Sequence, residues 1–136
     1  MPIKVVDLME MARNPDAQRT VLINGPRMHA WFHIYPKPGD KDDMHCHNGD
    51  QIFYMIDGEC TMHFPDGGAA VLHPGMIALI TAGSFYQLEN TGTDKMVLLG
   101  GRSGSSESIK HINHETREDA HMGTKGPEPT GTRILV

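Results

Sequence analysis

The chain has 136 residues, of which 38% are hydrophobic and 21% charged, and its net charge is −5. This length suits a single domain, and the composition fits neither a disordered chain nor a coiled coil. The negative net charge argues against nucleic acid as the main partner, because phosphate binding needs a surplus of Lys and Arg. No apolar run approaches the roughly 20 residues that span a membrane, so no membrane partner is expected.

Cysteine and histidine usage bear on compartment and chemistry. Only Cys46 and Cys60 are present, which excludes a disulfide framework and makes a reducing cytoplasm the expected location. The N-terminus also lacks the basic region, apolar stretch and cleavage site of a secretory signal. Nine histidines are many for this length, and they give the first indication of chemistry.

The elements begin with a short helix. Asp7 is a suitable N-cap with Glu10 three positions later, and Asn14-Pro15 ends the helical pattern. From residue 20 onward, short runs of β-branched, aromatic and aliphatic residues alternate with clusters of Gly, Pro, Asn and Asp, which indicates an all-β sandwich or barrel. The predicted strands are 20–24, 28–35, 43–47, 51–56, 59–64, 69–73, 76–81, 85–90 and 95–100.

These patterns divide the chain into a helical lead-in (1–19), a β-barrel (20–100) and a polar C-terminal tail (101–136). The tail contains few core-forming residues, and a loosely ordered segment is one interpretation. Its apolar end, Ile134-Leu135-Val136, could instead add a strand to its own sheet or to that of a partner subunit. The tail could thus also pack on the barrel or on a partner.

A His-x-His motif, His45-Cys46-His47, lies at the end of a predicted strand. Residues i and i+2 of a strand face the same side, about 6–7 Å apart at the backbone, so both imidazoles can reach about 2.1 Å to one transition metal. The motif alone is a weak signal in a histidine-rich chain. The next strand places Gln51, Phe53 and Met55 on one face and ends in a hairpin turn at Asp57-Gly58.

At this point the sequence resembles the cupin superfamily of small β-barrels. The first signature of the family is Gly, five residues, His-x-His, three or four residues, Glu, six residues, Gly. This chain has Gly39, His45, His47, Gln51 and Gly58 at the corresponding spacings. One residue departs from the pattern, because Gln51 stands where the family usually has Glu.

The second signature is Gly, five residues, Pro-x-Gly, two residues, His, three residues, Asn. This chain has Gly75, Thr81, Gly83, Tyr86 and Asn90 at those spacings. Thr81 replaces Pro, and Tyr86 replaces the usual metal-binding His. The resemblance covers about residues 20–100 and implies an all-β cupin barrel, also called a double-stranded β-helix or jelly roll.

Carried over to this chain, the resemblance makes His45 and His47 metal ligands and Gln51 a third ligand through its amide oxygen. The implied cofactor is one divalent transition metal ion: iron, manganese, nickel or zinc. An amide in place of a carboxylate removes one negative charge from the shell, which leaves the ion more electrophilic and more weakly held. A degenerate cupin that keeps both histidines without binding metal is the alternative.

Three roles are open to Tyr86, the candidate catalytic residue. As a phenolate it could ligate a Lewis-acidic ion, and as a phenol beside the ion it could act as general acid or base if its pKa of about 10 is lowered. Its ring could also simply fill the barrel. The tail residues His111, His114 and His121 could fold back to replace the lost ligand, although the simpler expectation is that they are solvated.

Alternation along the strands also predicts the pocket. On strand 28–35, Phe32 and Ile34 are expected inside, and Trp31, His33 and Tyr35 on the other side, at a sheet or subunit contact. The residues expected to line an apolar substrate pocket are Phe32, Ile34, Phe53, Met55 and Leu88. Such a cavity suits a small organic molecule, including an aromatic one.

Other polar and apolar positions suggest substrate and subunit contacts. Asp42 and Asp43 lie near the predicted mouth, where they could be solubilising or substrate-orienting. Ile52, Tyr54 and Ile56 face outward and add apolar surface, and because cupins commonly dimerise through such a sheet face, a homodimer is expected.

The leading function is a metal-dependent enzyme acting on a small organic substrate. Lyase, isomerase, cyclase and dioxygenase chemistry all remain open, although a neutral ligand set fits Lewis-acid chemistry slightly better than oxidation. The alternative is a non-catalytic small-molecule-binding or accessory protein with a degenerate metal site, which the exchange at Tyr86 favours.

Overall fold

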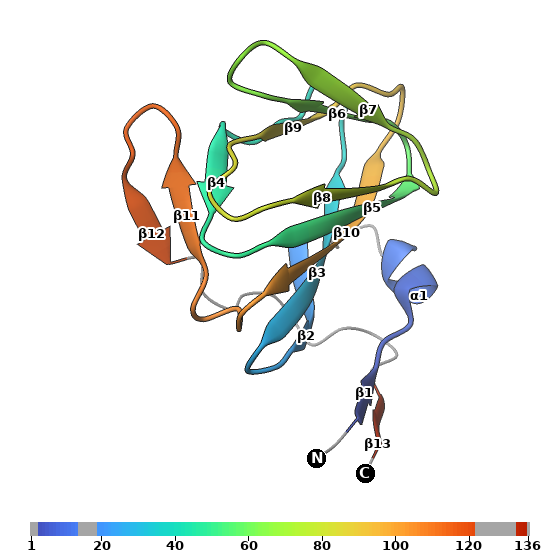
Figure 1. The fold of residues 1–136 in the computed structure, drawn as a ribbon. Helices are drawn as coiled ribbons and strands as arrows, with labels where there is room; N and C mark the ends of the chain where they lie inside the picture. Colours follow the sequence, from blue (N-terminus) through green and yellow to red (C-terminus); the bar gives the residue numbers. More distant parts are fainter. Residues whose placement is uncertain (1–2, 14–18, 122–132, 136) are drawn as a thin grey trace.

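Short strands make up most of the structure, a computed structural model that describes residues 3–13, 19–121 and 133–135. One layer is an antiparallel sheet with the strand order β2-β3-β10-β5-β8. Its strands are β2 (Arg19–Asn24), β3 (Met28–Tyr35), β5 (Gln51–Asp57), β8 (Ile77–Ile80) and β10 (Met96–Ser103), as Figure 1 shows.

A second layer consists of two three-stranded sheets, β7-β6-β9 and β12-β11-β4. Isolated bridges join them, one between His45 and Tyr86 and one between Lys41 and Glu89. The strands of this layer are β4 (His45–His47), β6 (Cys60–His63), β7 (Ala69–Leu72), β9 (Gln87–Asn90), β11 (Lys110–Asn113) and β12 (Asp119–His121).

The main core lies between these two layers. Phe53, Met55 and Leu98 point into it from the five-stranded sheet, and Met62 and Leu88 from the other layer. Side chains alternate across a strand, so each strand needs only every second residue to be apolar to build this core. The all-β prediction is confirmed, and each of the nine predicted strands is present with its ends shifted by at most three residues.

The two faces of β3 were assigned the wrong way round by the sequence pattern. Trp31 and Tyr35 lie in the main core, whereas Phe32 and Ile34 pack with Leu22 in a second cluster on the outer face of the sheet. The prediction that Phe32 and Ile34 line the pocket is therefore wrong. Strand β3 is apolar on both faces because the N-terminal segment covers its outer side, and alternation alone cannot tell which face is inner.

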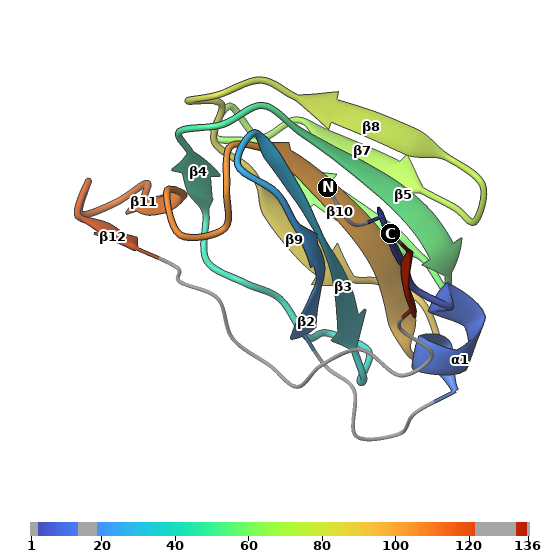
Figure 2. The same cartoon turned by 90° about the horizontal axis from the view of Figure 1, so that it is seen from below.

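That cover is the short helix α1 (Leu8–Ala12), which follows strand β1 (Ile3–Val5). The Asp7 carboxylate accepts a hydrogen bond from the backbone N–H of Glu10 at 3.0 Å, which confirms the predicted N-cap. Leu8 and Ala12 pack on the outer cluster, and Figure 2 shows α1 beside the sheet. Among the described residues, no helix has the length and apolar character needed to cross a bilayer.

The segment after residue 100 continues the sheets. Strand β10 runs on to Ser103, and β11 pairs with β4 on one side and with β12 on the other. Strand β13 (Arg133–Leu135) pairs antiparallel with β1 of the same chain, while Val136 and residues 122–132 lie outside the described residues. Strands β11 and β12 of the predicted tail thus extend the barrel beside β4, whereas β13 forms a separate two-stranded sheet with β1.

Two turn glycines provide a matched test of this fold. Gly58 and Gly67 both have positive φ, at 82° and 87°. A Cβ on Gly58 would collide with the carbonyl oxygen of Lys95, whereas a Cβ on Gly67 would meet nothing within 4 Å. We expect Gly67→Ala to lower the free energy of unfolding by about 1–2 kcal/mol, the cost of a left-handed alanine. Gly58→Ala should cost roughly 1–3 kcal/mol more, because the backbone must move.

Urea unfolding of both variants and the wild type measures the difference. Equal losses of stability in the two variants would contradict the close approach of Gly58 to Lys95.

Candidate metal centre

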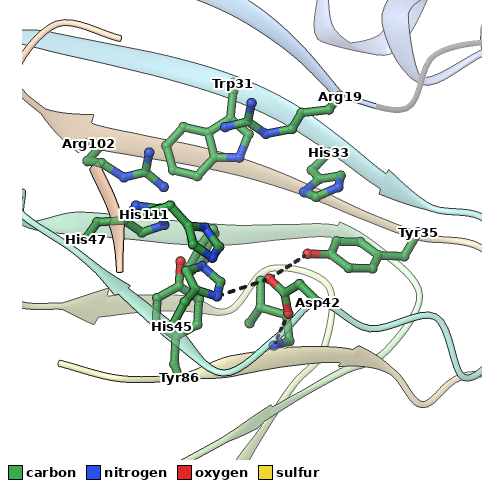
Figure 3. A pocket seen from close by; sticks show the side chains of 12 residues that line it. Arg19, Trp31, His33, Tyr35, Asp42, His45, His47, Tyr86, Arg102 and His111 are labelled. Carbon is green, nitrogen blue, oxygen red and sulfur yellow. Dashed lines mark hydrogen bonds and ion pairs between the residues drawn. The ribbon is translucent and has the colours of Figure 1, made fainter. Parts of the chain in front are cut away.

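Strand pairing brings three histidines together at one end of the barrel. His45 and His47 share a face of β4, and His111 of β11 is the direct antiparallel partner of His47. One ring nitrogen of each histidine lies within 4.8 Å of the others. The His45 and His111 rings stack with centroids 4.1 Å apart, and the His47 ring stands at 85° to both (Figure 3).

Hydrogen bonds fix the protonation of each ring. His45 Nδ1 lies 2.6 Å from the carbonyl oxygen of Asp43, and His47 Nδ1 lies 2.8 Å from that of Lys110. Because a carbonyl can only accept, both Nδ1 atoms donate and both Nε2 atoms keep a lone pair. His111 Nε2 lies 3.0 Å from the Asp43 carboxylate, so this ring keeps the lone pair on Nδ1. Each ring thus has one nitrogen occupied by an acceptor and a second nitrogen left for a ligand.

Asp43 organises two of the three rings. Its backbone carbonyl holds His45, and its carboxylate accepts from His111 and from the Asn113 side chain at 2.8 Å. Burial alone would raise the pKa of Asp43, but the hydrogen bonds from His111 and Asn113 bring that pKa below its ordinary value. Asp43, one of the two acidic residues predicted near the mouth, thus lies behind the histidines and supports them.

A pocket of about 160 Å³ opens beside the triad. Its lining residues are Arg19, Trp31, His33, Tyr35, Asp42, His45, His47, Phe53, Tyr86, Leu88, Arg102 and His111. Of the predicted lining residues, Phe53 and Leu88 are present in this wall. Met55 lies fully buried in the core and does not reach it, and Phe32 and Ile34 face the opposite side of β3.

The indole of Trp31 forms one wall of this pocket. A Cβ at position 100 would collide with this ring, so Gly100 of β10 allows the indole to lie across the sheet. The guanidinium carbon of Arg102 lies 4.1 Å from the Trp31 ring centroid and that of Arg19 lies 5.8 Å away, within the range of cation–π attraction. Phe53 meets the indole edge-on at 5.7 Å.

Gln51, the predicted third ligand, has a different partner. Its side chain is buried, and Oε1 accepts a hydrogen bond from Nε of Arg102 at 2.7 Å. Ligation by Gln51 stays a prediction, but the imidazole that joins His45 and His47 in the structure is His111.

Tyr86 lies directly across the second layer from His45. The two residues exchange both backbone hydrogen bonds at 2.9 Å, and their rings are 4.6 Å apart. The Tyr86 hydroxyl hydrogen-bonds with Gln51 and Arg102. Burial raises its pKa well above the ordinary value despite the nearby Arg102, so the side chain is a neutral phenol at neutral pH.

Asp42 and His33 supply two further titratable groups. Asp42 accepts hydrogen bonds from the Leu88 N–H at 2.8 Å and from the Tyr35 hydroxyl at 3.4 Å. Burial raises the pKa of Asp42 to about 6. His33 lines the pocket on the same face of β3 as Trp31 and Tyr35, and burial followed by the charge of Arg19 lowers its pKa to about 4.

Sequence reasoning assigned the tail histidines mainly to solvent, and for His111 this is wrong. The only local sign was the apolar pair Ile109 and Ile112 around it, which is too short a pattern to identify a strand. His114 stacks edge-on with Phe85 and lies outside the triad, and the side chain of His121 falls outside the described residues. The two pocket arginines were also missed, because an isolated arginine in a sequence carries no signal of burial.

The buried histidines predict a pH dependence of the metal-free protein. Burial is the largest cause that lowers the pKa of His45 to about 4 and that of His47 to about 2, as also for His33. Below about pH 6.5 these histidines are protonated in the unfolded chain but stay neutral in the folded protein. The free energy of unfolding must therefore fall as the pH drops from 6.5 towards 4. Each histidine contributes a slope of up to about 1.4 kcal/mol per pH unit.

Asp42 has the opposite effect on this slope, because its raised pKa means that the folded state binds a proton between about pH 4 and 6 that the unfolded chain has lost. Its contribution to the slope cancels that of about one histidine. Urea unfolding from pH 4.5 to 7.5 measures the net slope. We expect a His45→Gln/His47→Gln variant to flatten this slope. An unchanged slope in the double variant would contradict the assignment.

Comparisons with known proteins agree with this architecture. The family model described as the cupin domain matches residues 32–100. A double-stranded β-helix protein from Klebsiella pneumoniae is 19% identical, with a TM-score of 0.66 over 79% of this chain and 95% of that one. TT1209 from Thermus thermophilus is 25% identical, with a TM-score of 0.62 over 75% of this chain and 98% of that one.

A cupin domain from Bordetella pertussis is 21% identical, with a TM-score of 0.56 over 68% of this chain and 98% of that one. No curated protein matches the sequence significantly. The family model covers half of the chain, and both the barrel and the positions of its two signatures agree with it. The chain therefore belongs to the cupin family, and its residues 32–100 form the cupin domain.

Proposed function

We propose that the protein is a metal-dependent enzyme in which His45, His47 and His111 hold one divalent transition metal ion. The observation that carries this proposal is the convergence of three imidazoles, each of which also has a ring nitrogen hydrogen-bonded to a fixed acceptor. Acceptors of this kind behind metal-binding histidines set the tautomer and the ring orientation. Histidines that were simply exposed to solvent would form these hydrogen bonds with water instead of with three fixed protein oxygens.

The donor set fits such an ion. Imidazole suits zinc, iron and nickel, and three protein ligands leave positions open for substrate or water. Metal–nitrogen bonds of about 2.1 Å at tetrahedral angles place the nitrogen atoms about 3.4 Å apart. Nitrogen atoms that lie up to 4.8 Å apart must therefore move closer together, by up to about 1.4 Å, when the ion binds. When bound, the ion would supply a Lewis acid that polarises an oxygen of the substrate.

The chain's own groups favour proton transfer over oxidation. The Asp42 carboxyl lines the pocket, and its pKa of about 6 lets it take up or release a proton near neutral pH. The neutral phenol of Tyr86 can donate a hydrogen bond but cannot act as a base at that pH. A base and a donor beside a Lewis acid support lyase or isomerase chemistry on a small organic substrate, with Tyr86 in the role of the donor.

The homodimer also remains a proposal. Ile52 and Tyr54 of β5 are exposed and lie opposite the exposed Leu79 and Ile77 of β8, on the outer face of the sheet. This apolar surface is what supports self-association.

Metal content tests the ligand set. We expect His111→Ala, like His45→Ala and His47→Ala, to weaken metal binding beyond the roughly 10–100-fold that loss of an outer-shell partner costs. Gln51→Met, which removes the amide at similar volume, should keep the metal. The measurement is elemental analysis of protein purified without added ions, followed by titration against a chelator.

His63→Ala is the matched control, because His63 lies outside the triad and its Nε2 is 2.8 Å from a carboxylate oxygen of Glu89. Metal that is lost in Gln51→Met and kept in His111→Ala would identify Gln51 as the third ligand. Absence of metal from the wild type under every loading condition would favour the non-catalytic binding protein.

Proton transfer can be tested without knowing the product. A panel of small hydroxy and keto acids in deuterated water is followed by NMR for exchange of carbon-bound hydrogen, with oxygen uptake recorded in parallel. Asp42→Asn should slow exchange by about 10²–10⁴-fold and leave the metal content unchanged, because it removes the base but no ligand. Oxygen uptake coupled to substrate loss would instead identify a dioxygenase.

A further inference from the structure

Two guanidinium groups share the Trp31 wall of the pocket, and they are held differently. Arg102 is hydrogen-bonded to Gln51 and Tyr86, so its charge helps to hold neutral side chains in place. Arg19 begins β2 directly opposite His33 of β3, and this register turns its side chain to the pocket side of the sheet (Figure 3).

Within the part of the chain that the structure describes, the Arg19 guanidinium has no hydrogen bond and no carboxylate partner, and its guanidinium carbon lies 5.8 Å from the centroid of the Trp31 ring. Burial lowers the pKa of Arg19 from its ordinary value, so the cation is partly withdrawn from water. A cation in such a position is destabilised unless an anion joins it.

No group of the pocket supplies that anion. Asp42 is the one carboxylate among the described lining residues, and its oxygens accept from Leu88 and Tyr35 instead. His33, the cross-strand neighbour of Arg19, is neutral near pH 7. Among the described residues nothing compensates the positive charge of Arg19 on this side of the pocket, and Phe53 and Leu88 add apolar wall.

We propose that Arg19 binds the carboxylate of a small organic acid whose carbon skeleton lies against Trp31 and Phe53. The planar guanidinium presents parallel N–H donors that match the two oxygens of a carboxylate. A single arginine beside a neutral histidine in about 160 Å³ suits this monoanion better than a phosphate, which usually takes several cations or backbone N–H groups. This deepens the proposed function by naming the substrate class, but binding at Arg19 does not itself require the metal.

The test uses full-length protein, both metal-loaded and chelator-treated. Isothermal titration calorimetry measures binding of acetate, benzoate and phenylacetate, each beside its neutral amide, and of inorganic phosphate. We expect at least one carboxylate to bind at least tenfold more tightly than its amide. Arg19→Gln should abolish this preference, and Arg19→Lys should restore part of it.

Arg27→Gln is the matched control, because Arg27 is exposed and lines a different surface hollow. The proposal is overturned if no carboxylate is preferred over its amide, if Arg19→Gln keeps the preference, or if phosphate binds more tightly than every carboxylate.

Metal content of the same samples separates this inference from the proposed function. Carboxylate binding that depends on Arg19 in a protein that takes up no metal would support the inference and overturn the enzyme proposal. A metal-loaded protein without carboxylate preference would overturn the inference alone.

Discussion

The site depends on one strand pairing, that of β11 with β4. The antiparallel register sets His111 against His47 and Asn113 against His45, so a residue 64 positions after His47 arrives on the same face of the same sheet. A shift of one residue would turn His111 to the opposite face and place Ile112 at the triad. The pairing also carries the carbonyl of Lys110 to His47 and the side chain of Asn113 to Asp43. Backbone geometry thus fixes both the donors and their supports.

The charge around the triad depends on the fact that its three side chains are imidazoles and not carboxylates. Three imidazoles bring no negative charge, so any bound cation keeps its full charge, and Arg19 and Arg102 add to the positive potential of the pocket. Of the lining residues in the described part of the chain, Asp42 alone has a carboxylate, which opposes this positive potential. With an ion bound, such a cavity would attract anionic organic ligands and repel cationic ones. The charge of the pocket therefore restricts its organic ligands more than its shape does.

The sequence allowed the barrel, the nine strands and the positions of His45, His47 and Tyr86 to be predicted, because alternation and turn residues are local signals. Assignment of the β3 faces failed because both faces are buried, one by the second layer and one by α1. His111 could be offered only as one alternative, because it reaches the site through pairing with a strand far away in the chain. Arg19 was missed because nothing in the sequence around it marks burial, and Trp31 because it lies on the face of β3 that was assigned outward. The close approach of Trp31 to Gly100 shows the same limit, as only tertiary structure explains why that glycine is needed.

The third imidazole of the cluster comes from His111 on a peripheral strand and not from position 86, where the family signature has His, and this has a wider consequence. A scan of this protein by its family signatures alone would record a missing donor and conclude that the centre has decayed. The backbone bridge between Tyr86 and His45 shows that position 86 borders the cluster, to which it presents the aromatic ring of Tyr86. Loss of a signature residue in such barrels is therefore informative only after every strand that flanks the histidine pair has been searched for a substitute.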